Sequence, residues 1–206
     1  MTITQSLLAF LLAAGLLTVT PGLDTALVLR TATAEGARQA ARAAFGINLG
    51  CLLWGAAVAL GLGALLAASQ LAFEALRWAG AAYLCWLGLR LLWRPRERFA
   101  VEPAATGLRL GWFARGLLSN LLNPKIGVFY ISFLPQFVPA GLPAAPWTFL
   151  LAVLHVAMGI AWCAALILAS QPLGRLLRRP AVLRWMDRLT GGVFIGFGVH
   201  LALGRR

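Results

Sequence analysis

Charged residues are scarce in this chain of 206 residues: they account for 12% of the sequence, against 61% for hydrophobic residues. Because an average soluble domain carries about 25% charged residues, this composition excludes an ordinary soluble fold and predicts an integral membrane protein. Acidic residues are the scarcest, with six against 18 Lys and Arg, for a formal net charge of +12. The arginines stand in short segments between apolar runs, as in cytoplasmic loops, so we expect a lipid bilayer and no nucleic acid as partner.

Cysteine and histidine are also rare. The three cysteines, Cys51, Cys85 and Cys163, fall in separate apolar runs and form no CxxC pair, which argues against a disulfide framework and against a thiol-redox enzyme. His155 and His200 are too far apart in sequence to indicate a ligand pair, and we expect packing or satisfied polar contacts for both. No cofactor, no metal site and no enzymatic activity are expected.

Basic residues are missing from the start of the chain, where none precedes Arg30. Residues 1–19 resemble the hydrophobic core of a signal peptide, but the basic segment that opens such a peptide is absent. We therefore expect this stretch to belong to a first transmembrane helix.

Six apolar runs are long enough, or nearly so, to cross a hydrocarbon core of about 30 Å, which takes about 20 helical residues. The sequence thus predicts an all-α integral membrane protein with six transmembrane helices. The runs cover residues 6–29, 43–68, 73–93, 116–138, 146–170 and 189–203.

Arginine is concentrated at the ends of the first, third and fifth runs. These three places hold three, six and five cations, so only four of the 18 lie elsewhere. By the positive-inside rule, loops 1, 3 and 5 are predicted to be cytoplasmic, and both termini are predicted outside.

A linker-like segment, 95–106, divides the single domain of residues 1–206 into halves 1–94 and 107–206. Because each half has three helices, the second must run inverted relative to the first. Inverted three-helix repeats are a transporter architecture whose site lies at discontinuous helices near the midplane. Each half has one such interruption, at Pro21 and Pro124, so helices 1 and 4 are predicted to be broken. Both lie roughly 13 Å from the cytoplasmic end at 1.5 Å per residue, whereas strict inversion would mirror the depths.

A polar residue precedes each proline, in Thr20-Pro21 and Asn123-Pro124. Thr or Asn as N-cap with Pro at the first helical position is a helix-start signal, so we expect each break to open a new half-helix. The positive ends of both half-helices would point into the protein and bind carboxylates. The carbonyls that end the preceding half-helices would accept from an ammonium group.

Two opposite charges accompany the breaks: Asp24, and Lys125, the only lysine of the chain. An ionisable residue costs about 3 kcal/mol or more at the bilayer centre, which favours a functional pair over a structural one. A zwitterionic amino acid fits, with its carboxylate toward Lys125 and its ammonium toward Asp24. Substrate occupancy could then change whether Asp24 holds a proton, which gives a route for coupling export to proton influx.

Two asparagines, Asn48 and Asn120, could line the same cavity, although interhelical hydrogen bonding accounts for them equally well. The glycine pairs at 46 and 50 and at 192 and 196 predict close helix packing. The predicted substrate-binding and coupling residues are Thr20, Pro21, Gly22, Asp24, Thr25, Asn48, Asn120, Asn123, Pro124 and Lys125.

Four stretches, residues 20–25, 46–50, 79–88 and 120–125, carry a resemblance to a known family. In this order and spacing they are similar to those of the LysE/RhtB family of bacterial amino-acid exporters, over nearly the whole chain. The resemblance implies efflux of amino acids or close derivatives by proton antiport across the bacterial inner (plasma) membrane. The chain departs from the family where Leu23 replaces a second proline and where Cys51 replaces a frequent acidic residue.

Two other functions stay open on the residues alone. An ion or metal exporter of similar architecture would need several carboxylates or histidines converging in the membrane, where only Asp24 is expected. A non-transporting membrane assembly partner would need no charge at the breaks. Among amino acids a neutral one is slightly favoured, because a cationic one would need a second intramembrane acid. Whether the chain forms a homo-oligomer is also left open.

Overall fold

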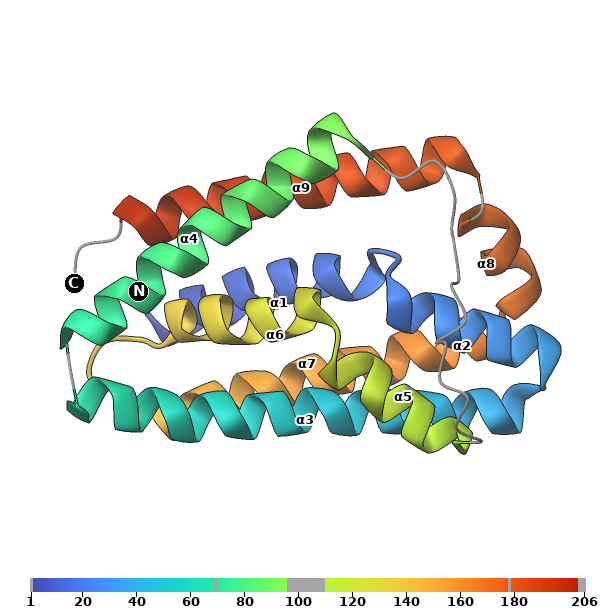
Figure 1. The fold of residues 1–206 in the computed structure, drawn as a ribbon, viewed down its shortest axis with the longest axis horizontal. Helices are drawn as coiled ribbons and strands as arrows, with labels where there is room; N and C mark the ends of the chain where they lie inside the picture. Colours follow the sequence, from blue (N-terminus) through green and yellow to red (C-terminus); the bar gives the residue numbers. More distant parts are fainter. Residues whose placement is uncertain (1, 69, 96–109, 178, 204–206) are drawn as a thin grey trace.

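The computed structural model describes residues 2–68, 70–95, 110–177 and 179–203, and these form helices with no strand among them, as predicted (Figure 1). The linker predicted at 95–106 lies outside the described residues apart from Pro95. The helices are α1 (Ile3–Val19), α2 (Leu23–Ala34), α3 (Ala37–Ala68), α4 (Gln70–Trp93), α5 (Trp112–Leu121), α6 (Pro124–Phe133), the 3-10 helix η1 (Leu134–Phe137), α7 (Ala144–Leu168), α8 (Ser170–Leu177) and α9 (Pro180–Leu203).

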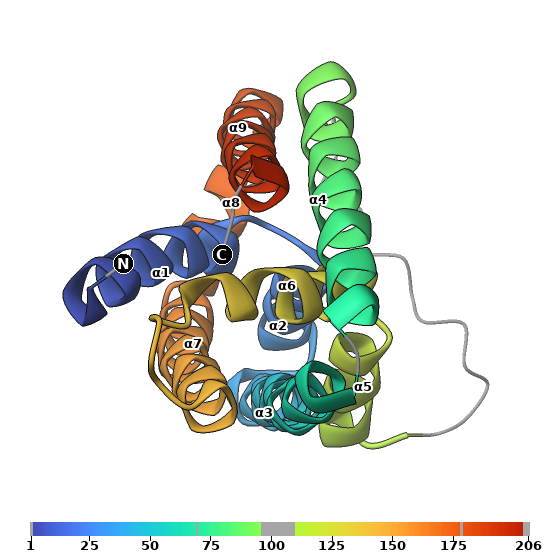
Figure 2. The same cartoon turned by 90° about the vertical axis from the view of Figure 1, so that its left-hand side faces the viewer.

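The long helices lie along one axis, and the chain reverses direction from each to the next (Figure 1). α1 and α2 run together along this axis, α3 returns, and α4 runs obliquely in the first direction. α5 and α6 then run together in the opposite direction, followed by α7 and α9 in turn. α1 therefore begins at the end of the molecule where α9 finishes. Seen along the axis, α4 and α9 lie side by side at one edge of the molecule, and the other long helices are grouped next to them (Figure 2).

Large apolar side chains are exposed on the outward faces of these helices. Leu12 on α1 is 76% exposed, Leu60 on α3 is 75% exposed and Leu168 on α7 is 88% exposed. Apolar surface of this extent destabilises a protein in water, whereas in a bilayer it contacts lipid chains. The pattern is that of a membrane protein.

Two helical segments are long and apolar enough to cross a membrane alone, Ala37–Gly61 of α3 and Ala144–Leu168 of α7. Two bent pairs also qualify if each counts as one span: α1 with α2, and α5 with Lys125–Phe137. The described part of the chain thus holds two to four candidate spans by length and composition, against six predicted. The predicted run at 189–203 is part of a longer helix, because α9 begins at Pro180.

Both interruptions predicted from proline are helix breaks. α1 and α2 are bent by 49°, and α5 meets Lys125–Phe137 at 53°. A proline removes a backbone donor and clashes with the preceding turn, so a straight helix does not continue through either position. At the second break the predicted cap is confirmed: Asn123 is the N-cap of α6, its side chain accepts from the Lys125 N–H at 3.1 Å, and Pro124 follows.

The first break is capped differently from the prediction. The N-cap of α2 is Gly22, in an extended conformation and without a side-chain cap, rather than Thr20. Thr20 is instead the C-cap of α1, and its backbone N–H and its hydroxyl both donate to the Leu16 carbonyl, at 3.0 and 2.7 Å. Because the threonine hydroxyl is used on the preceding helix, the first N–H groups of α2 have no side-chain acceptor.

Two apolar clusters lie on either side of the breaks. The larger one joins α1, α3, α6, η1, α7 and α9, and its centre is a run of aromatic rings in which Phe129 stacks on Phe133 at 4.5 Å between centroids. The smaller one joins α2, α3 and α7 around Val28 and Leu166, both fully buried. The region around the breaks, which lies between the two clusters, contains the polar side chains.

Glycine lets α3 and α5 approach at backbone distance. A Cβ added to Gly46 would collide with the Phe113 carbonyl, and one added to Gly116 would collide with the Ala43 carbonyl. A Cβ on Gly50 would lie 2.6 Å from the side-chain oxygen of Asn120. The close packing predicted for the glycines at 46 and 50 is therefore confirmed.

The same prediction is wrong for the glycines at 192 and 196, where an added Cβ meets no described atom within 4 Å. α9 approaches α4 through Gly191 and Gly198 instead: a Cβ on Gly191 would lie 2.7 Å from the Gly88 carbonyl. The face of α9 that packs on α4 is therefore rotated by about one residue from the predicted face. The spacing of glycines alone does not determine this rotation.

Adding one methyl group at the α3–α5 contact is expected to destabilise the protein. Gly46→Ala and Gly116→Ala force two backbones apart, and overpacking of this kind costs about 1–3 kcal/mol. The midpoint of thermal unfolding in detergent should fall by several degrees in both variants. Gly192→Ala is the matched control, because it adds the same methyl group to open space on a helix and should leave the midpoint unchanged or slightly higher. Equal midpoints for all three variants would contradict the close contact.

Candidate functional site

A cavity opens at the level of the two breaks. It contains about 600 Å³ of empty space, its open mouth included. Its walls come from α1, α2, α3, α6 and α7 and from both breaks. Among the predicted residues, those that line it are Thr20, Gly22, Asp24, Thr25, Asn48, Asn123 and Lys125.

The three other predicted residues do not line this cavity but lie next to residues that do. Pro21 is buried within the first break. Asn120 is fully buried and contacts Asp24. Pro124 occupies the first position of α6, and its side chain is outside the described part of the structure.

The Asp24 carboxylate is held by two side chains of α5, from the other broken helix. Asn120 Nδ2 donates to Oδ2 at 2.9 Å, and Ser119 Oγ donates to Oδ1 at 3.2 Å. Asp24 also lies in the first turn of α2, where the helix dipole favours a negative charge. The first and second breaks are thus joined through one carboxylate. Sequence reasoning missed Ser119, whose only signal was a hydroxyl next to Asn120 in an apolar run.

The Lys125 ammonium lies at the start of α2. A Cβ placed on Gly22 would be 3.7 Å from Lys125 Nζ, so the side chain crosses from the second break to the first. The ammonium and the uncapped N–H groups of α2 together produce a positive potential at one side of the cavity. Asp24 and Lys125 line the same cavity and interact electrostatically. This arrangement can bind an anionic group and a cationic group a few ångströms apart.

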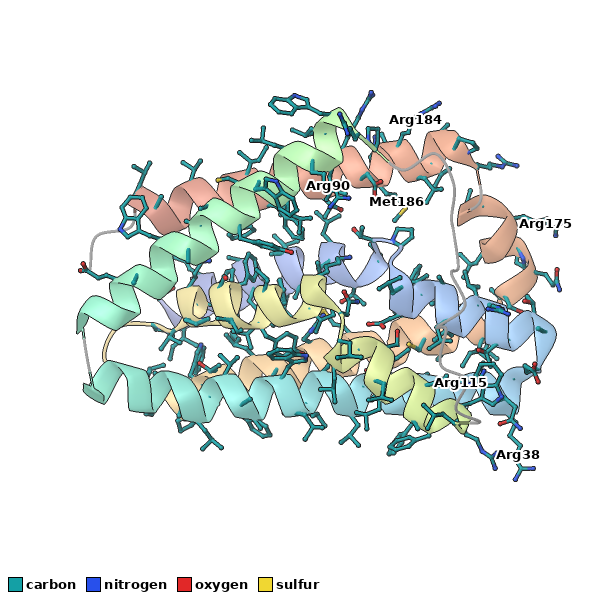
Figure 3. All side chains as sticks on the ribbon, in the orientation of Figure 1. Arg38, Arg90, Arg115, Arg175, Arg184 and Met186 are labelled. Carbon is teal, nitrogen blue, oxygen red and sulfur yellow. The ribbon has the colours of Figure 1, made fainter. Side chains whose placement is uncertain are left out.

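Helix α9 is attached to the first break by a buried pair of threonines. Thr20 Oγ1 lies 2.6 Å from Thr190 Oγ1, and because the Thr20 proton is directed to Leu16, Thr190 is the donor. Met186 points from α9 toward α2 and packs against the smaller apolar cluster (Figure 3). Asp187, less than one turn before Thr190, is fully buried. Asp187 lies outside the predicted run at 189–203, because α9 begins at Pro180.

Several residues at the cavity were not predicted as site residues. Cys51, His155, Trp162 and Cys163 line it, and Cys51 accepts from Asn120 Nδ2 at 3.3 Å. The expectation of a satisfied contact for His155 is confirmed, since its Nδ1 lies 2.9 Å from the Tyr130 hydroxyl. Among the described residues, no group of three or more His, Cys, Asp or Glu is placed to hold a metal ion.

Asn48 faces the cavity but also satisfies its own helix. Its Nδ2 donates to the Ala44 carbonyl at 2.8 Å, one turn earlier on α3. Its Oδ1 lies against Gly159 of α7, where an added Cβ would be 2.6 Å away. Asn48 therefore lines the cavity, while its hydrogen bond to Ala44 lies within α3 rather than between helices.

Known proteins are similar to this chain over nearly its whole length. The model of the LysE type translocator family matches residues 15–205. A homoserine/homoserine lactone efflux protein of Salmonella typhi is 31% identical over 198 residues, which cover 96% of each chain. A threonine efflux protein of Escherichia coli K12 is 30% identical over 202 residues, 91% of this chain and 92% of that protein. An uncharacterized membrane protein of Vibrio cholerae serotype O1 is 34% identical over 197 residues, 95% of each chain. No solved structure matches.

Removing the amide that holds Asp24 is expected to impair the site. A hydrogen bond to a charged group contributes about 1.5–3 kcal/mol, so Asn120→Leu should weaken ligand binding or transport by about 10-fold to 100-fold. Thr31→Val is the matched control, because Thr31 is a fully buried residue on α2 whose hydroxyl donates to Leu27 of the same helix and which does not line the cavity. Ligand-dependent thermal stabilisation measures the difference. Equal stabilisation of both variants would show that Asn120 does not support the site.

Proposed function

Because the chain belongs to the LysE type translocator family, we propose that it exports an amino acid, or a close derivative, from the cytoplasm in exchange for protons. The observation that carries this proposal is the pair of opposite charges, Asp24 and Lys125, in one cavity between two broken helices. The relatives named as homoserine and threonine efflux proteins support an amino-acid substrate.

A zwitterion fits the two sides of the cavity. Its carboxylate binds at the Lys125 ammonium and the free N–H groups of α2, beside Gly22. Its ammonium binds at the Asp24 carboxylate. The Leu17 carbonyl can also accept from this ammonium. In a continuous helix it would accept from the N–H of residue 21, but Pro21 has no N–H. A substrate with one positive and one negative group thus neutralises both charges of the site.

Proton antiport follows from competition for one carboxylate. The substrate ammonium and a proton both neutralise Asp24, so only one of them occupies the site at a time. When the substrate leaves on the outer side, a proton can take its place and be carried inward. The anchors from Ser119 and Asn120 keep the carboxylate in position during both steps.

We further propose that the protein crosses the inner membrane six times, with α4 and α9 as spans in addition to α3, α7 and the two bent pairs. Each of these helices has 24 residues, about 36 Å at 1.5 Å per residue. Corresponding helices of the two halves pack on each other, α3 on α7 and α4 on α9, which favours halves related by an inverted repeat. Arg38, Arg115 and Arg175 lie toward the end of the molecule occupied by α8, the proposed cytoplasmic side (Figure 3).

Transport in inside-out vesicles tests the exporter proposal. We expect one or a few labelled amino acids from a panel to accumulate when a proton gradient is imposed, and accumulation to be lost in Lys125→Ala, because the substrate carboxylate loses its counter-charge. Correct insertion is checked by protease accessibility of the termini. Gradient-dependent accumulation of a metal ion without any amino acid would favour the ion exporter, and no transport at all would favour an assembly role.

Replacing Asp24 by Asn separates binding from coupling. The amide keeps the shape and one acceptor oxygen but takes up no proton, so gradient-driven accumulation should disappear. Exchange of labelled for unlabelled substrate across the same vesicles should continue at a reduced rate, because it needs no net proton movement. Unchanged accumulation in Asp24→Asn would remove this residue from the coupling mechanism.

A further inference from the structure

One face of α7 forms a wall of the cavity that carries no full charge. His155, Gly159 and Trp162 line the cavity at spacings of four and three residues, which places them on one side of the helix. Asn48 of α3 fills the gap over Gly159. The charged residues come from the other walls, Asp24 from α2 and Lys125 from α6. A substrate bound through both its charged groups therefore directs the rest of its structure toward neutral polar side chains.

His155 is fixed in orientation by Tyr130. The Tyr130 hydroxyl lies 2.9 Å from His155 Nδ1, and the two side chains are 0% and 5% exposed. The ring of Phe129 packs against the imidazole with 5.4 Å between centroids. Because Nδ1 is occupied, Nε2 is the ring nitrogen that is left for a ligand in the cavity. Among the described residues, Tyr130 is the hydrogen-bond partner of His155.

Buried side chains lie between this histidine and Asp24. Cys51 accepts from Asn120, Asn120 donates to Asp24, and Tyr130 is buried in the same cluster as Cys51. Both Asp24 and His155 line the cavity. The position of the histidine relative to the carboxylate is thus set by packed, buried groups rather than by a mobile side chain.

The indole N–H of Trp162 is a further polar group in this wall of the cavity. This Nε1–H is buried and has no acceptor among the described residues, while the residue lines the cavity. A buried donor without an acceptor is unfavourable by about 1–3 kcal/mol, and in a cavity wall a ligand can remove that cost. The indole and the imidazole lie on the same face of α7, about two helical turns apart.

We propose that His155, positioned by Tyr130, forms together with Trp162 the subsite that contacts the substrate side chain and selects uncharged side chains with a hydrogen-bonding group. This inference rests on the amino-acid export proposed above. Lys125 lines the same cavity as His155, so a cationic side chain in this cavity meets a like charge. An aliphatic side chain would leave the imidazole Nε2 and the indole N–H unpaired, which a site built for hydrogen bonding discriminates against.

Isosteric substrate pairs test the subsite. Threonine and valine, and asparagine and leucine, have similar shapes but differ in hydrogen-bonding capacity. We expect the wild-type protein to prefer the polar member of each pair in competition for counterflow, by about threefold to tenfold. His155→Leu should bring the preference close to one, and His155→Gln, which retains a donor near the position of Nε2, should restore part of it.

The positioning role of Tyr130 is measured separately. Tyr130→Phe keeps the ring but releases His155, so the half-saturation concentration should rise for threonine and stay unchanged for valine. Trp162→Phe should lower the preference by a smaller factor. Thr148→Val is the matched control: Thr148 is a buried hydroxyl on α7 that lies away from the cavity and has no partner within the described residues, so the preference should be retained.

The outcomes distinguish this inference from the exporter proposal. If the wild-type protein moves no amino acid, the exporter proposal fails. If it transports threonine and valine equally well, or if His155→Leu and Tyr130→Phe change both substrates by the same factor, export stands and the subsite is overturned. If His155→Leu does not insert into the membrane, Trp162→Phe and Tyr130→Phe take its place. Their preference ratios for the polar over the apolar substrate decide the same question.

Discussion

The two prolines at the centre of the bent helices are the constraint on which the rest of the structure depends. In a bilayer every backbone donor and acceptor must find a partner inside the protein, so an interrupted helix is tolerated only where the freed groups face other residues or a polar cavity. Here both breaks face the same cavity. Asn123 caps one of the new helix starts, while the other, at Gly22, has no side-chain cap. That unused positive end is what makes the cavity suited to an anionic group.

The breaks are held at a fixed separation by contacts that lie outside them. Glycines allow α3 and α5 to touch at Gly46 and Gly116, which brings Asn120 against α3 and directs its amide to Asp24. Thr190 of α9 reaches Thr20 at the opposite side of the same break. The Asp24 carboxylate is thus in direct contact with α5, and α9 is in direct contact with the end of α1.

The parts of this site that are local in sequence could be predicted, and the parts that depend on helix rotation could not. A proline that follows a polar residue inside an apolar run predicts a helix break. A lone acidic residue and a lone lysine near the breaks predict the charges of the site. The partner of Asp24 on α5 and the partner of Thr20 on α9 depend on which faces of the helices meet, and hydropathy carries no information on rotation. Asp187 was missed for a related reason: arginines around it gave the start of α9 the composition of a loop. His155 looked like a packing residue because a single polar residue on an apolar helix is compatible with both roles.

The cavity divides its two tasks between two kinds of helix. The charges that we propose bind the constant part of an amino acid are on α2 and α6, which begin at the breaks and are bent relative to the helices before them. The neutral polar groups are on α3 and α7, the two continuous helices that are long enough to span a bilayer alone. Bent helices can change their angle at little cost, whereas a straight, packed pair resists deformation. In the proposed export cycle, alternating access can therefore move the charged wall, where we propose that a proton replaces the substrate ammonium, while the neutral wall keeps its shape.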